Sequence, residues 1–279
     1  MTSVCFYFQV HQPFRLDHHS IFDIGSNKPY FNAADGTDLD NRAIMNKVAT
    51  KCYRPMTALL AELLDRHPQF RVTFSITGTA LEQFEAFAPD VIELFQTLAA
   101  TGRVEFLNET YHHSLAFIHS PEEFKRQIRM HADKIKEVFG VTPTVFRNTE
   151  LIYNNDLADT IRELGFTGML AEGADHILGW RSPNFVYRSY GTSALPLLLK
   201  NYKLSDDIAF RFGEKTWEEY PLTAEKFATW VNSNHGTGDV VNLFMDYETF
   251  GEHQWEDTGI FTFMRQLPTE LYRHPDTLF

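Results

Sequence analysis

Short apolar, β-rich runs alternate with longer segments of helical periodicity along the whole chain, and this alternation constrains the fold more than any other feature. Strict alternation indicates βα units around a parallel sheet. The runs read as apolar on both faces, which is typical of parallel strands covered by helices. The seven predicted strands are Val4–Val10, Arg71–Ile76, Arg103–Leu107, Thr144–Asn148, Gly168–Ala171, Pro196–Leu199 and Val240–Asp246. Seven strands favour a closed α/β barrel over an open sheet.

The intervening segments carry helix signals at their ends. Ser120 followed by Pro121 and two glutamates is typical of a helix start, and Gly140 and Gly165 are typical of helix ends. The predicted helices are Arg42–Arg66, Ala80–Ala100, Pro121–Phe139, Asp156–Leu164, Ala224–Asn232 and Thr258–Gln266.

The length of 279 residues suits a single α/β barrel domain. We predict one domain over residues 1–279, with a long loop excursion around 173–215. An excursion of that length between barrel elements often shapes a substrate site.

The net charge of −12 disfavours nucleic acid and anionic membranes as partners, because like charges repel. No signal peptide and no apolar stretch long enough to span a membrane is visible, so we expect a cytoplasmic protein. The two cysteines, Cys5 and Cys52, are expected to be buried thiols. Nothing in the sequence indicates the oligomeric state.

Polar residues follow four of the predicted strands. They are His11-Gln12 after the first, Asn108–His113 after the third, Arg147–Glu150 at the fourth and Asp246–Glu248 at the last. Active sites of βα barrels lie at the carboxyl ends of the strands. One shared pocket therefore explains the pattern better than four separate helix caps. Paired carboxylates at different strand ends suit glycoside hydrolysis, in which one protonates the leaving oxygen and the other attacks the anomeric carbon.

Four stretches of the chain resemble, in order, the conserved regions of glycoside hydrolase family 57. They are Phe8–Pro13, Glu109–His113, Phe146–Glu150 and Phe244–Gly251. The resemblance is specific as a combination, extends over nearly the whole chain and is nearest to the α-amylase-like branch. It implies a (β/α)7 barrel and a retaining double displacement on α-1,4-linked glucans. It also implies a helical region beyond the barrel, which we expect to be absent because the sequence stops at Phe279.

Site roles also follow from the resemblance. It implies Glu150 as nucleophile, Asp246 as general acid/base and His11 in the sugar subsite beside the cleaved bond. The other residues predicted to bind substrate are Gln12, Tyr111, His112, His113, Arg147, Glu248, Phe250 and Trp255. No metal or other cofactor is expected, and the expected partner is an α-glucan or maltooligosaccharide.

Other functions stay open at the level of sequence. The same scaffold suits a 4-α-glucanotransferase or a branching-type transglycosylase, because loop shape decides whether water or a sugar resolves the intermediate. A metal-dependent carbohydrate deacetylase is the alternative from another class, with His11, His112 and His113 as candidate ligands. A non-catalytic glycan-binding relative is the third alternative.

Overall fold

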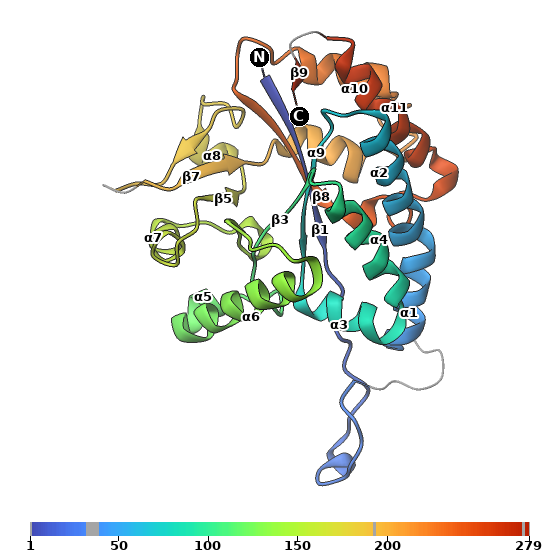
Figure 1. The fold of residues 1–279 in the computed structure, drawn as a ribbon, viewed down its shortest axis with the longest axis vertical. Helices are drawn as coiled ribbons and strands as arrows, with labels where there is room; N and C mark the ends of the chain where they lie inside the picture. Colours follow the sequence, from blue (N-terminus) through green and yellow to red (C-terminus); the bar gives the residue numbers. More distant parts are fainter. Residues whose placement is uncertain (1, 32–38, 192–193, 275–276, 279) are drawn as a thin grey trace.

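Seven parallel strands surround the centre of the molecule in two sheets (Figure 1). The computed structural model describes residues 2–31, 39–191, 194–274 and 277–278. One sheet has the order β3-β2-β1-β8, with the two-residue β9 also pairing with β1, and the other has the order β4-β5-β7-β6. The strands are β1 (Thr2–Val10), β2 (Val72–Ile76), β3 (Val104–Phe106), β4 (Val145–Arg147), β5 (Gly168–Ala171), β6 (Tyr187–Arg188), β7 (Pro196–Leu199), β8 (Val240–Asp246) and β9 (Thr277–Leu278).

Two narrow seams join the sheets into a barrel. At the first seam, Asn108 just beyond β3 forms a parallel bridge with Phe146 of β4. At the second, the backbone N–H of Asn201 donates to the carbonyl of Asn242 in β8 (2.9 Å), and the Asn242 side-chain amide donates to the Leu199 carbonyl (2.8 Å). All strands except β6 run parallel along this circuit. The prediction of an α/β fold with a distorted (β/α)7 barrel is confirmed.

The two faces of the strands differ in polarity. In β1, Phe6 and Phe8 pack with the surrounding helices, whereas Tyr7 and Gln9 point into the barrel with Ser75 of β2. Successive side chains of a strand face opposite sides. The expectation of apolar residues on both faces therefore fails for part of the interior, where a hydrogen-bonded polar network adjoins an apolar cluster that includes Leu170 and Phe244.

Helices cover the outer face. They are α1 (Asn41–Val48), α2 (Arg54–Arg66), α3 (Gly78–Phe87), α4 (Pro89–Ala100), α5 (Ala116–His119), α6 (Pro121–Phe139), α7 (Asn155–Glu163), α8 (Asp175–Leu178), α9 (Tyr202–Ala209), α10 (Ala224–Asn232) and α11 (Ile260–Tyr272). The single helix predicted over 80–100 is wrong, because Ala88 leaves helical geometry before Pro89 starts α4. The helix predicted over 42–66 is confirmed with one change: a π-helical turn, η2 (Ala49–Tyr53), joins α1 to α2. Among the described helices, none is long and apolar enough to cross a membrane.

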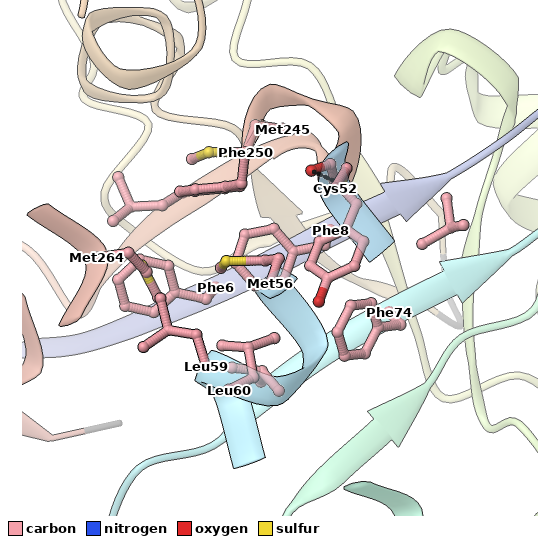
Figure 2. Close-up of a cluster of buried hydrophobic side chains, with 14 of the residues drawn as sticks. Phe6, Phe8, Cys52, Met56, Leu59, Leu60, Phe74, Met245, Phe250 and Met264 are labelled. Carbon is pink, nitrogen blue, oxygen red and sulfur yellow. Dashed lines mark hydrogen bonds between the residues drawn. The ribbon is translucent and has the colours of Figure 1, made fainter. Parts of the chain in front are cut away.

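The largest core lies between β1, β2, β8 and the helices beside them. Phe8 contacts Phe74 and Phe250, with ring centroids 5.6 Å away in each case. Met56 and Leu60 of α2 reach the same cluster (Figure 2). This core fixes β1 and β8 side by side, and both strands end at the candidate site.

The range 173–215 contains more regular structure than the predicted loop. It holds α8, β6, β7 and α9, and the crossover from β5 to β7 uses the four-residue α8 and the short strand β6. Figure 1 shows α8 and β7 on the side of the molecule away from α1, α2 and α4.

Candidate active site

The carboxyl ends of β1, β4 and β8 converge on a polar cavity of about 230 Å³. The side chains that line this polar cavity are Gln9, His11, Gln12, His113, Arg147, Glu150, Asp246, Glu248 and His253. Both predicted catalytic carboxylates and five of the predicted substrate-binding residues are among them. The expectation of one pocket shared by several strand ends therefore matches the geometry.

Glu150 lies in a strained turn just after β4. Glu150 and Leu151 both have φ of 56°, and His113 has φ of 54°. These are the only non-glycine residues with positive φ in the described part of the chain. Each such conformation costs on the order of 1–2 kcal/mol, and strain of this kind concentrates at functional sites. The turn leaves the Glu150 side chain 68% exposed and within reach of His113.

His113 connects Glu150 to a buried carboxylate. Its Nε2 lies 3.0 Å from Glu150 Oε1, and its Nδ1 lies 3.3 Å from Glu109 Oε2. Both ring nitrogens face carboxylate oxygens, so both bonds form only when both nitrogens carry protons. The hydrogen bond from His113 and the charge of Arg147 lower the pKa of Glu150, although partial burial acts the other way. Glu150 is therefore held as an anion, the state that a nucleophile requires.

Glu109 is fully buried and charged. Burial acts to raise its pKa, but the hydrogen bond from His113 and the charges of His131 and Arg147 outweigh burial and lower the pKa to about 2. Its Oε1 also accepts a hydrogen bond from Gln9 Nε2 at 3.0 Å. The interior network of the barrel therefore ends on the carboxylate that supports His113.

Asp246 ends β8, and its exposed side chain contrasts with the buried strand before it. Glu248, two residues on, is 5% exposed and accepts a short hydrogen bond from the Tyr53 hydroxyl. Burial, with the negative charge of Asp246, raises the pKa of Glu248 to about 8, although the Tyr53 hydrogen bond opposes this. The exposed Asp246 therefore lies beside a buried carboxyl group whose raised pKa favours its protonated form.

The π-helical turn η2 fixes the loop that carries these two residues. Cys52 Sγ donates to the Tyr247 carbonyl (3.1 Å), and Thr57 Oγ1 lies 3.0 Å from the Tyr247 hydroxyl. Gly251 has φ of 110°, and a Cβ there would lie 1.9 Å from the carbonyl oxygen of Lys51. Only glycine allows this approach of the loop to η2.

Arg147 is 6% exposed, and its Nε and Nη1 atoms have no hydrogen-bond partner. Buried guanidinium groups usually have their donors satisfied. Arg147 lines both the polar cavity and a second cavity of about 180 Å³. Besides Arg147, the residues shared by the two cavities are Gln9, Glu150, Asp246 and His253.

Four predicted substrate-binding residues lie outside both cavities. Phe250 is 1% exposed and Tyr111 is 7% exposed, and neither lines either cavity, so their contact with substrate stays a prediction. The Phe250 ring packs in the core, and the Tyr111 ring occupies space that a side chain at Gly78 would fill. His112 is exposed beside the Tyr111 ring, and Trp255 is 59% exposed with the Lys51 ammonium 5.3 Å from its ring centroid.

The sequence analysis missed several lining residues. Gln9 faces the polar cavity, while Glu172 after β5 and Lys200 after β7 line the second cavity with His253. Glu172 and Lys200 each come directly after a strand, and polar residues at strand ends are the pattern that predicted His11, Glu150 and Asp246. Gln9 was hidden because it lies inside an apolar run.

No group of three or more histidine, cysteine, aspartate or glutamate side chains arranged to hold a metal ion occurs within the described ranges. The predicted ligands of a deacetylase are also separated: His11 and His113 line the polar cavity, whereas His112 does not.

Comparisons with known proteins identify related sequences and folds. A Methanocaldococcus jannaschii protein named "Putative alpha-amylase" is 48% identical over 272 residues, which are 97% of this chain and 56% of that protein. The 4-α-glucanotransferase of Thermococcus litoralis has a TM-score of 0.74 at 18% identity, over 99% of this chain and 38% of that one.

A polysaccharide deacetylase from Mycobacterium smegmatis shares the fold with a TM-score of 0.63 at 18% identity, over 99% of this chain and 86% of its own. The match to the M. jannaschii protein covers only 56% of that protein, so this chain spans about half the length of this curated relative. The family model described as glycosyl hydrolase family 57 matches residues 5–279, and the chain belongs to that family.

Proposed function

We propose that the chain is a retaining glycoside hydrolase acting on α-1,4-linked glucans, with Glu150 as nucleophile and Asp246 as general acid/base. The observation that carries the proposal is that both carboxylates line one polar cavity, which also contains His11, Arg147 and Glu248. Names among the relatives, α-amylase and 4-α-glucanotransferase, support α-glucans as the substrate class.

The surroundings of Glu150 suit its proposed role. Glu150 is held as an anion by His113 and Arg147 and attacks the anomeric carbon. Asp246, exposed to solvent, donates a proton to the departing glycosidic oxygen and then deprotonates the incoming hydroxyl. Retention requires the two carboxyl groups to lie about 5–5.5 Å apart, which placement in one small cavity supports.

Transglycosylation is the second candidate. The two carboxylates also line the second cavity, so the proposed intermediate on Glu150 is approached from two sides. An acceptor sugar held in one cavity while the glycosyl group occupies the other gives transfer in place of hydrolysis.

Product analysis on maltooligosaccharides tests the proposal. The wild type is compared with Glu150→Gln and Asp246→Asn, with and without EDTA. Glu163→Gln at the end of α7 and Asp133→Asn on α6 are matched controls, because both side chains are exposed and line neither cavity.

We expect chelator-insensitive turnover that falls at least about a hundredfold in both site variants and persists in both controls. The product ladder separates hydrolysis from transfer. Turnover that survives in the site variants contradicts the assignment of roles, and loss with EDTA supports a metal-dependent mechanism.

A further inference from the structure

A third concave region, the outer groove, opens beside Glu150 on the outside of the barrel. Its volume is about 1280 Å³, and Glu150, Leu151 and Glu172 line both this groove and the second cavity. The three compartments therefore meet around one carboxylate. A volume above the usual 300–1,000 Å³ of small-ligand pockets fits a chain of several sugar rings.

The groove exists because the crossover between β5 and β7 lacks a full helix. Leu197 and Leu199 of β7 line the groove, whereas Leu198 between them points into the barrel. Barrel helices ordinarily cover this outer face, but here the crossover supplies the four-residue helix α8 (Figure 1), and β6 extends the same sheet at the edge of β7. The outer face of β7 is therefore left as the floor of an open channel.

The walls of the groove combine flat rings with polar groups. Tyr153, Tyr187 and Tyr190 supply aromatic faces, and Tyr190 is 83% exposed. Within the described ranges, the side chains of His176 and Tyr190 take part in no hydrogen bond or ion pair. A neutral oligosaccharide suits such walls, because pyranose faces stack on aromatic rings while hydroxyl groups bond to polar side chains.

We propose that the outer groove binds the distal part of an oligosaccharide whose reacting end lies at Glu150, with Tyr190 as a stacking residue that sets preference for longer chains. This inference rests on the proposed α-glucan function. It adds a site for the distal chain beyond the two small cavities. A groove opening at the reacting carboxylate favours an extended substrate over a protein segment as its occupant.

Calorimetric binding to the chain carrying Glu150→Gln tests the inference without turnover, using maltotriose and maltoheptaose. We expect the ratio of the maltotriose Kd to the maltoheptaose Kd to fall about tenfold when Tyr190→Ala is added. Tyr190→Phe, used in place of Tyr190→Ala, keeps the ring and should leave the ratio of Kd values unchanged. Tyr30→Ala is the matched control, because Tyr30 is 67% exposed and lines none of the three compartments.

An unchanged ratio, or no detectable binding of maltoheptaose to the Glu150→Gln chain, overturns the inference. An unchanged ratio is also the result expected if a protein segment covers the groove. The proposed function fails separately: it requires maltooligosaccharide cleavage by the wild type that both carboxylate substitutions abolish. Intact cleavage together with an unchanged ratio of Kd values refutes the proposed role of the outer groove and leaves the proposed function unaffected.

Discussion

The imidazole ring of His11 stacks on that of His113, with centroids 4.2 Å apart and an angle of 20° between the ring planes. His11 Nδ1 also lies 2.9 Å from Thr77 Oγ1. His113 carries two protons when it bridges Glu109 and Glu150, and two stacked imidazolium rings would repel each other. The stack therefore requires His11 to be neutral, and burial together with His113 lowers the pKa of His11 to about 4.

We predict that His11 makes the fold less stable in mild acid. Its pKa is about 4 in the folded chain and 6.5 when unfolded, so the unfolded chain binds more protons between these values. The free energy of unfolding then falls as pH drops from 6.5 to 4, by about 1–3 kcal/mol from this group. Urea titrations should show a smaller fall in His11→Gln, while the exposed His18→Gln should follow the wild type. Equal falls in all three proteins would contradict the prediction.

Glu248 should make the fold less stable as pH rises, the opposite of the effect of His11. Its pKa rises from 4.5 to about 8 on folding, so the folded chain binds more protons in that window and its stability falls as pH increases. Glu248→Gln keeps an acceptor for the Tyr53 hydroxyl and removes the titration. We expect its unfolding free energy to gain on the order of 3 kcal/mol relative to the wild type between pH 5 and pH 9. Glu252→Gln, in the same loop, is the comparison; a constant difference for Glu248→Gln would refute the prediction.

Arg147 should be required for stability as well as binding. Arg147→Met removes one of the groups that hold the buried Glu109 ionised, while the contacts of Glu109 with His113 and Gln9 remain, so we expect a cost of about 1–3 kcal/mol. Chemical denaturation should show a loss of this order, with a smaller loss for Arg147→Lys, which keeps the charge. If Met and Lys variants are equally stable, the charge of Arg147 does not support Glu109.

Gly251→Ala should damage the Asp246 loop. An added Cβ meets the Lys51 carbonyl as well as an unfavourable φ, whereas Gly140, with φ of 73°, has open space around it. We expect Gly140→Ala to cost about 1–2 kcal/mol and Gly251→Ala clearly more, with lower kcat. Thermal unfolding and maltooligosaccharide turnover check both variants, and equal losses in the two would show that the Lys51 contact is unimportant.

The sequence predicted the elements of this molecule better than their side-chain contacts. The seven main parallel strands and the positions of His11, Arg147, Glu150 and Asp246 at strand ends follow from apolar periodicity and from polar residues after strands. Phe250 lies in one of the stretches that resemble the family, but its ring packs against Phe8. The sequence does not show this contact, because it does not show which face of the loop meets the core.

Some features of the site depend on contacts between distant segments. The π-helical turn η2 has no local signal, since Ala49–Tyr53 reads as ordinary helix, and its geometry is fixed by bonds to Tyr247 and Glu248 almost two hundred residues away. The polar interior also depends on contacts between distant segments, because Gln9 in β1 donates to Glu109, one hundred residues further along the chain. The sequence therefore did not predict it.

The two seams have fewer hydrogen bonds than the sheets that they join. Each sheet is a continuous ladder, but the sheets are joined by one bridge at Asn108 and by the few bonds at Asn201 and Asn242. Amide exchange should therefore resolve two protected blocks that open at their borders before either block melts. Glu109–His113 and Arg147–Glu150 flank the first border, so opening there would change the distance between His113 and Glu150.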